Sequence, residues 1–180
     1  NKIKNNSSRI ALLLMGCMLT SSIFLLYSFI CDNNLQIQYS FEWFSTGKFK
    51  IDIGYHVDSV AAIMLFVVSL IGFLVHLYST EYMRGDARYS RYFAFLGIFI
   101  FSMNGIILAD SLILMYIFWE LVGLSSFLLI GFWFEKKSPP LAANKAFLTN
   151  RVGDIGMFIG IMILYFNIGT FNIDKIINGA

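Results

Sequence analysis

The stretch from Ser111 to Phe134, SLILMYIFWELVGLSSFLLIGFWF, is an apolar run with a single charged residue, Glu120. A helix rises about 1.5 Å per residue, which puts Glu120 roughly 14 Å from the Ser111 end. The hydrocarbon core of a bilayer is about 30 Å thick, so this carboxylate would lie near its centre. Because a charge there costs about 2.5 to 3.5 kcal/mol even on the mildest scale, Glu120 predicts an ion or proton pathway with a partner charge nearby.

The composition of the whole chain is that of a membrane protein. Of its 180 residues, 58% are hydrophobic and 13% are charged, whereas soluble domains carry about 25% charged residues. Five apolar runs each reach the length of about 18 residues that a crossing helix needs. We therefore expect an all-α polytopic membrane protein with about five transmembrane helices, at about 10–31, 59–79, 92–109, 111–134 and 141–168.

The basic residues are distributed unevenly between the two sides. If every run crosses, one side carries eight basic residues and the other three. The positive-inside rule then places the N-terminus in the cytoplasm or an organelle matrix. Because the chain starts at Asn1 and stops soon after its fifth run, we expect it to be a fragment of something longer. The basic residues of the inner side are Lys2, Lys4, Arg9, Arg84, Arg88, Arg91, Lys136 and Lys137, and those of the outer side are Lys48, Lys50 and Lys175.

One long segment, 32–58, separates the first two runs. Within it, apolar and polar side chains alternate from Phe49 to His56, and a turn at 45–47 joins this run to QIQYSFEWF. Period-two alternation beside a glycine-containing turn predicts a short β-hairpin on the outer face, with an irregular loop as the alternative. The chain then divides into a first transmembrane helix at 1–31, an external loop with the hairpin at 32–58, and a four-helix transmembrane segment at 59–180.

Three helix boundaries carry local signals. Asp58 is placed to cap the N-terminus of the second run. The pair Asp110-Ser111 leaves almost no loop between the third and fourth runs, so these helices must be antiparallel neighbours. Ser138 followed by two prolines predicts the start of the fifth helix, with the serine as its cap.

The fifth run is the second one with ionisable residues, since it contains Lys145, Arg151 and Asp154. Arg151 and Asp154 are spaced i, i+3 and can pair on the helix surface. Counted from Pro140, Asp154 lies about 21 Å along the helix, a depth that matches Glu120. We therefore expect Glu120 and an Arg151–Asp154 pair in one polar layer, serving either transport or the locking of two helices together.

A second stripe of the same helix contains Gly153, Gly156 and Gly160 in line with Lys145. Small residues at this spacing predict a close helix–helix contact. Lys145 itself has two interpretations. Near the cytoplasmic end it could extend to the interface, or, buried in the bundle, it could carry protons.

His76 lies near the cytoplasmic end of the second run. Imidazole titrates near neutrality and could pass protons inward; the alternative is an interfacial histidine beside Tyr78 and Tyr82. We expect Trp119 and Trp133 to contact lipid or pack against other helices. The sequence has no glycine-rich phosphate loop, metal cluster or nucleophile triad, so any redox cofactor is expected in another subunit.

Three motifs together resemble one family. They are HLYSTEYMRGD at 76–86, SLILMYIFWELVGLSSFLLIGFW at 111–133 and NKAFLTNRVGDIG at 144–156. They are similar to the largest antiporter-like membrane subunit of proton-pumping NADH:quinone oxidoreductase (respiratory complex I), called subunit L in bacteria and NADH dehydrogenase subunit 5 in mitochondria. The resemblance covers about residue 35 to the end, and 1–31 matches only as an apolar run, in the position of the family's second helix.

The resemblance implies a larger helical bundle with inverted repeats and broken helices. It implies that Glu120 is the essential membrane carboxylate, paired with a lysine on a helix beyond Ala180, and that Arg151 and Asp154 support pumping. The broken helix and the central lysines and histidines would also lie outside these residues.

The function implied is proton translocation through buried Glu, Lys and His groups, coupled to electron transfer elsewhere in the complex. The candidate pathway residues are Glu120, Asp154, Arg151, Lys145 and His76.

FMN, iron–sulfur clusters and quinone would belong to partner subunits. The partners would be the lipid bilayer and other membrane-arm subunits, especially the adjacent antiporter-like one, with no nucleic acid. We expect a bacterial inner membrane rather than a mitochondrial one. The alternatives are the large subunit of a multisubunit cation/proton antiporter and a structural membrane subunit.

Overall fold

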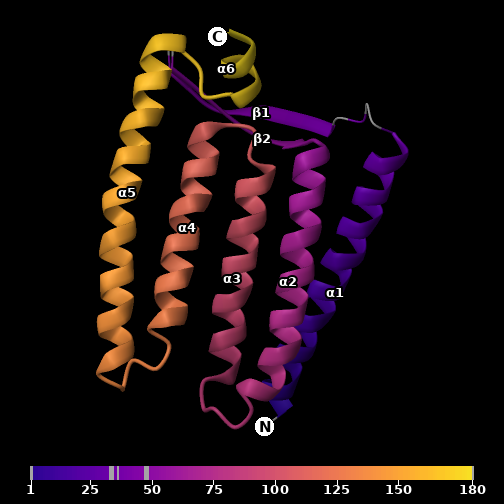
Figure 1. Ribbon diagram of the computed structural model, residues 1–180, viewed down its shortest axis with the longest axis vertical. Helices are drawn as coiled ribbons and strands as arrows, with labels where there is room; N and C mark the ends of the chain where they lie inside the picture. Colours follow the sequence, from indigo (N-terminus) through magenta and orange to yellow (C-terminus); the bar gives the residue numbers. More distant parts are fainter. Residues whose placement is uncertain (1, 33–34, 36, 47–48, 180) are drawn as a thin grey trace.

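The computed structural model describes residues 2–32, 35, 37–46 and 49–179. Five long helices run antiparallel to their neighbours along the chain (Figure 1), and a two-stranded hairpin lies between the first and second. The predicted all-α membrane architecture with an added hairpin is confirmed, and a short sixth helix was not predicted. The elements are α1 (Lys2–Cys31), β1 (Ile37–Thr46), β2 (Phe49–Val57), α2 (Ser59–Tyr82), α3 (Tyr89–Leu108), α4 (Leu112–Ile130), α5 (Ser138–Ile168) and α6 (Ile173–Gly179).

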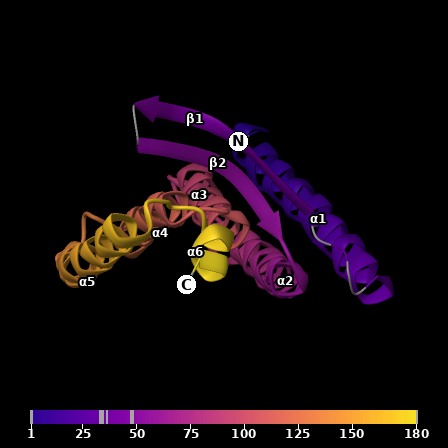
Figure 2. The same ribbon diagram turned by 90° about the horizontal axis from the view of Figure 1, so that it is seen from above.

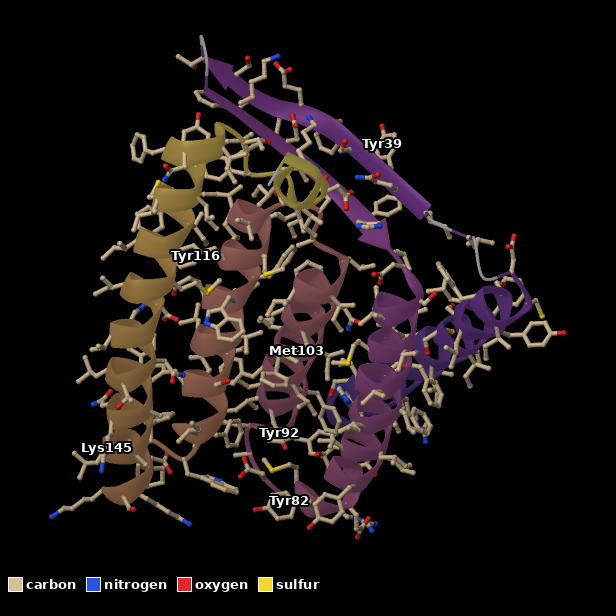
Figure 3. All side chains as sticks on the ribbon, turned by 45° about the horizontal axis from the view of Figure 1, so that its top comes forward. Tyr39, Tyr82, Tyr92, Met103, Tyr116 and Lys145 are labelled. Atoms are coloured by element: carbon tan, nitrogen blue, oxygen red, sulfur yellow. The ribbon has the colours of Figure 1, made fainter. Side chains whose placement is uncertain are left out.

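All five long helices are long and apolar enough to cross a membrane. Between 6% and 28% of the most apolar window of each helix is buried by the described chain. Most of the helical surface is therefore free to contact lipid or other helices. Viewed end-on (Figure 2), α2 to α5 form one row, and α1 packs beside α2 at its edge. Side chains project from both faces of this row (Figure 3).

The helix boundaries follow the local signals, with two corrections. Asp58 caps α2, because its carboxylate Oδ1 accepts a hydrogen bond of 2.7 Å from the Ala61 N–H. The fourth helix ends at Ile130 rather than continuing to Phe134, since Gly131 and the residues after it form turns. Ser138 is the first residue of α5 and not its cap; the preceding Lys137 has helical backbone angles and makes no side-chain cap. The prolines do lie in the first turn of α5, where a missing N–H costs nothing.

The hairpin lies across one end of the helix row, which we call the hairpin end (Figure 1). Its strands are antiparallel, with an irregularity between Glu42 and Phe44. The predicted turn falls partly on residues outside those described. Tyr55 of β2 forms a bridge with Ala109, which follows α3. The hairpin is thus joined directly to the connection between α3 and α4.

The segment between α5 and α6 meets the same connection. Gly169 ends α5 with a φ of 83°, a left-handed conformation that glycine adopts without strain. The chain then turns back, and the Leu112 N–H donates to the Phe171 carbonyl at 2.9 Å. Ser111 forms a bridge with Asn172. Three chain segments therefore meet at the hairpin end, around residues 109–111, which link α3 to α4.

Candidate functional site

The carboxylate of Glu120 forms an ion pair with the guanidinium of Arg151 on the neighbouring helix. Glu120 is the ninth of the 19 residues of α4, and Arg151 lies near the middle of α5. The Arg151 Nη1 donates to the Glu120 Oε2. The side chains of Glu120 and Arg151 are 20% and 43% exposed, respectively, in the described chain. Within the described chain, the partner charge of the mid-helix carboxylate is Arg151; the lysine that the resemblance implies beyond Ala180 stays a prediction.

The second oxygen of the same carboxylate has a neutral partner. The hydroxyl of Tyr116, one helical turn nearer the hairpin end, donates to the Glu120 Oε1 at 2.7 Å. The ring of Tyr116 lies 5.5 Å from that of Phe158 on α5, between their centroids. Both oxygens of Glu120 therefore have donors, one charged and one neutral, which is how a carboxylate away from water stays stable in its ionised form.

Asp154 takes its hydrogen bond from an indole. The Nε1 of Trp119 donates to the Asp154 Oδ1 at 3.1 Å, and Asp154 is 7% exposed. The predicted pairing of Arg151 with Asp154 along one helix is wrong, because Arg151 pairs across to Glu120 instead. A buried carboxylate without any hydrogen-bond donor would be costlier than one that accepts a hydrogen bond from an indole N–H. Trp119 is likewise not only a lipid or packing residue.

The result is a layer of two lateral contacts between α4 and α5. Adjacent residues of α4, Trp119 and Glu120, contact residues three apart on α5, Asp154 and Arg151. The predicted single polar layer is present, with different pairs inside it. Phe147 supports the layer, because the Arg151 guanidinium lies 4.8 Å from the centroid of its ring, a favourable cation–π distance. Chemically, this arrangement can hold a negative charge or accept a proton at Glu120.

Lys145 does not join this layer in the described chain. Its side chain is exposed, and it forms no ion pair with any described residue. Figure 3 places it toward the end of α5 that is remote from the hairpin, well below Tyr116. The stripe of Gly153, Gly156 and Gly160 also faces away, since a methyl group added at any of them would meet nothing within 4 Å. The predicted close helix contact at this stripe is not made by the described helices.

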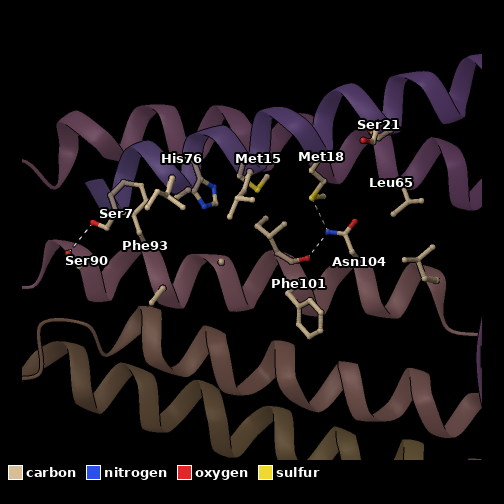
Figure 4. A pocket seen from close by; sticks show the side chains of 18 of the residues that line it. Ser7, Met15, Met18, Ser21, Leu65, His76, Ser90, Phe93, Phe101 and Asn104 are labelled. Carbon is tan, nitrogen blue, oxygen red and sulfur yellow. Dashed lines mark hydrogen bonds between the residues drawn. The ribbon is translucent and has the colours of Figure 1, made fainter. Parts of the chain in front are cut away.

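His76 lies on α2, apart from the layer between α4 and α5 (Figures 1 and 4). The residue is 1% exposed, with its Nδ1 2.8 Å from the Gly72 carbonyl oxygen. The interfacial interpretation is therefore wrong, because the ring turns inward toward Phe93 of α3. His76 lines a largely apolar cavity of about 900 Å³ between α1, α2 and α3, with Ser7 and Met15.

Sequence reasoning missed Tyr116 and the role of Trp119. The signal for Tyr116 was its i, i+4 spacing from Glu120, which places two side chains on one helical face. The signal for Trp119 was its indole N–H, which needs an acceptor when it is buried away from water. The indole signal does not identify the acceptor, since the position of Asp154 on the facing helix depends on how α4 and α5 pack.

The fold is shared by solved membrane complexes. One is the membrane-bound sulfane sulfur reductase, an archaeal respiratory membrane complex, with a TM-score of 0.77 and 15% identity over 94% of this chain and 34% of that one. Another is the Mrp complex from Dietzia sp. DQ12-45-1b, with a TM-score of 0.72 and 21% identity over 94% of this chain and 20% of that one. Both likenesses concern the fold alone.

Sequence relatives are more informative. NAD(P)H-quinone oxidoreductase subunit 5, chloroplastic, of Chlorokybus atmophyticus is 42% identical over 93% of this chain and 25% of its own length. NAD(P)H-quinone oxidoreductase chain 5 of a Picosynechococcus strain is 41% identical over 97% of this chain and 26% of its own length. The chain thus spans about a quarter of the length of the curated relatives it matches.

Two family profiles match successive parts of the chain. Residues 43–93 match the N-terminus of chain 5 of NADH-ubiquinone oxidoreductase (complex I). Residues 109–180 match the transmembrane family of NADH:quinone oxidoreductase and Mrp antiporter subunits, and this part contains Glu120, Arg151 and Asp154. With five membrane-spanning helices, a shared fold and relatives above 40% identity, the chain belongs to the antiporter-like chain 5 family of the membrane subunits of complex I.

Proposed function

We propose that this chain is the part of a proton-translocating subunit that contains its membrane carboxylate, Glu120. The observation that supports this most directly is the ion pair between Glu120 and Arg151, formed by two helices in the middle of their membrane-spanning length. A purely structural helix contact would be cheaper to build from apolar side chains, because two charges must otherwise be removed from water. A charge pair at this depth is therefore retained for ion movement in our proposal.

The proton would be carried by making and breaking this pair. When Glu120 is ionised, Arg151 and the Tyr116 hydroxyl both donate to it. A proton arriving at Glu120 neutralises the carboxylate and removes its attraction for the guanidinium. Arg151 is then free to turn toward Asp154, three residues along the same helix, where the second negative charge of the layer lies. Departure of the proton restores the original pair.

We assign the redox chemistry to other subunits in this proposal. FMN, iron–sulfur clusters and quinone would be bound by partners, and the charge movement would reach this subunit through neighbouring membrane-arm subunits, especially an adjacent antiporter-like one. The partner surfaces would be the lipid bilayer and these subunits, with no nucleic acid. The chloroplastic and cyanobacterial relatives favour a thylakoid membrane, alongside the bacterial inner membrane that we expect from the sequence.

A second candidate is the large subunit of a multisubunit cation/proton antiporter. The profile over 109–180 covers both complex I and Mrp antiporter subunits, and the Mrp complex has a similar fold. In that case the same carboxylate layer would exchange a proton for a cation without electron transfer. The N-terminal profile over 43–93 is described for complex I alone and favours the first candidate.

The test is Glu120→Gln in the full-length subunit within its native membrane complex. We expect normal assembly and loss of proton pumping, measured as acidification driven by NADH or NADPH. Glu81→Gln is the matched control, because Glu81 also pairs with an arginine, Arg84, but both side chains are more than three-quarters exposed. The control should pump normally, since surface pairs contribute about 0–1 kcal/mol.

Three outcomes distinguish the proposed function from its alternatives. Normal pumping by the Glu120→Gln complex would remove Glu120 from the pathway and contradict the proposal. Loss of assembly with normal pumping in whatever complex remains would favour the structural alternative. Purification of the subunit with small membrane proteins only, and with cation-dependent proton exchange in place of electron transfer, would favour the antiporter.

A further inference from the structure

Asp110 is a buried carboxylate at the hairpin end, outside the membrane-spanning helices. It is 1% exposed and lies between α3 and α4, where three segments meet. Its own carbonyl accepts a 3.0 Å hydrogen bond from the Ile173 N–H at the start of α6. The preceding residue, Ala109, forms the bridge to Tyr55 of β2. The side chain of Asp110 is thus enclosed where the hairpin rests on the helices.

The carboxylate has no satisfactory partner in this enclosure. Neither Oδ1 nor Oδ2 has a hydrogen bond of good geometry with a described residue. The backbone N–H groups of Asp110 and Gly54 lie near enough to attract it, without completing such bonds. Gly54 makes the close approach possible, because a methyl group there would collide with the Asp110 carboxylate and the Tyr39 carbonyl. An ionised carboxylate in this position would be poorly compensated.

The charged groups around Asp110 do not help it to ionise. Asp52 of β2 and Asp174 of α6 repel a negative charge there. The nearby basic side chains face these or other acids: His56 lies 3.5 Å from Asp174, and Lys50 lies 3.5 Å from Glu42. Two further charged side chains belong to the same region, Asp58, which caps α2, and Lys175, which lines a small cavity beside Asp52 and Lys50.

Burial raises the pKa of the Asp110 carboxyl above its ordinary value of 3.8. The N–H groups of Asp110 and Gly54 oppose this shift, and the charges of Asp52 and Asp174 add to it. The direction agrees with the geometry, since a carboxyl that is enclosed without a cation favours its neutral form. When the hairpin is displaced and water reaches the group, its ordinary pKa returns.

We propose that Asp110 is a proton-operated latch, which holds the hairpin on the helix ends when it is protonated and releases the hairpin when it ionises. The latch would respond to the pH of the compartment that the hairpin faces. The proposal stands on the enclosure of Asp110 by Gly54 and does not require proton translocation through Glu120.

The direction of the pH dependence follows from the two states. Below the ordinary pKa of 3.8, Asp110 is protonated whether or not the hairpin is docked, so docking is fully stable. Between that value and the raised pKa of the docked state, the released state binds fewer protons, and docking weakens about tenfold per pH unit. Above the raised pKa the loss is complete. Docking is therefore strongest when the facing compartment is acidic.

The test measures amide hydrogen exchange of residues 37–57 in the full-length protein, within its complex in lipid nanodiscs, from about pH 4 to about pH 9. Protection is expressed relative to the unstructured rate at each pH. The natural protein should lose protection by up to about tenfold for each pH unit between the ordinary and the raised pKa of Asp110. Asp110→Asn, which is neutral and nearly the same shape, should keep its protection throughout. Asp58→Asn is the matched control, because asparagine retains the helix cap and the pH dependence should stay.

A second variant and a second signal keep the test decisive. Gly54→Ala should lower hairpin protection even at low pH, because its methyl group occupies the place of the carboxylate. In infrared difference spectra, the natural protein should show the carbonyl stretch of a protonated carboxylic acid that Asp110→Asn lacks. A pH-independent hairpin in the natural protein, or unchanged pH dependence in Asp110→Asn, would overturn the latch. Either result would leave the role of Glu120 untouched.

Discussion

Glu120 and Asp110 are two carboxylates ten positions apart. Both are withdrawn from water, but they differ in the hydrogen-bond donors that surround them. Glu120 lies in the middle of a membrane-spanning helix, and both of its oxygens have donors, from Arg151 and Tyr116. Asp110 lies at the end of the helices, more deeply buried, and neither oxygen has a hydrogen bond of good geometry with a described residue. The deeper membrane position thus contains the better compensated charge.

The difference shows that depth in the bilayer does not by itself decide the state of a carboxyl group. Glu120 forms an ion pair with Arg151, so a proton that binds its carboxylate must compete with a guanidinium. Asp110 has no such competitor, so its neutral form is stabilised by the enclosure itself. One group is suited to respond to charge movement along the membrane, and the other to the pH of the aqueous phase beside it.

The largest effect is expected when Arg151 is removed. Arg151→Leu leaves Glu120 without a cation, and breaking a buried pair in this way costs about 3 to 5 kcal/mol. Because the Arg151 side chain is 43% exposed in the described chain, we expect the lower part of that range or less, about 1 to 3 kcal/mol. The thermal stability of the purified complex and its yield on native gels would measure this loss.

The double variant Glu120→Gln with Arg151→Leu is the control for that loss. It removes both charges, so it should recover most of the stability, and the double-mutant cycle should give a coupling of about 0.5 to 3 kcal/mol. Purely additive effects would mean that the two side chains do not depend on each other. Glu120 would then be compensated by the neutral Tyr116 hydroxyl and not by a cation, and the contrast with Asp110 would be smaller.

A smaller effect is expected from Trp119→Phe. The change leaves the Asp154 carboxylate, which is 7% exposed, without its indole donor. An unsatisfied buried acceptor costs about 1 to 3 kcal/mol. Trp133→Phe is the matched control, because its indole donates to Asp86 at the same distance of 3.1 Å, outside the membrane-spanning helices, where water can replace it. Equal losses of thermal stability in both variants would show that water reaches Asp154 between α4 and α5 as readily as it reaches Asp86 in the loop.

The sequence was sufficient to predict the five helices, the hairpin and the position of Glu120 near the middle of α4. Composition and the length of the apolar runs predict the helices, and period-two alternation predicts the hairpin. The position of Glu120 within its run follows from counting residues. These features depend on neighbours along the chain, so they can be read without knowing how the helices pack.

The partners of the charged groups could not be predicted in the same way. The i, i+3 spacing favoured Arg151 with Asp154, but the packing of α4 on α5 brought Glu120 within reach and made the cross-helix pair better. The sequence around Asp110 predicted only a short loop. Its burial could not be predicted, because it depends on Gly54, more than fifty residues earlier. Contacts between helices are decided by tertiary structure, and periodicity does not specify them.

The smallest effect is expected from Tyr116→Phe. It removes one donor from Glu120, but the Oε2 keeps Arg151, so we expect a loss of about 0.5 to 1.5 kcal/mol in thermal stability and a modest fall in pumping. Tyr78→Phe is the control, because that side chain is largely exposed. If Tyr116→Phe stopped pumping as completely as Glu120→Gln, the hydroxyl would have to carry the proton itself. Glu120 would then be one member of a relay that extends along α4 toward the hairpin end, and the separation between its role and that of Asp110 would be smaller than their surroundings indicate.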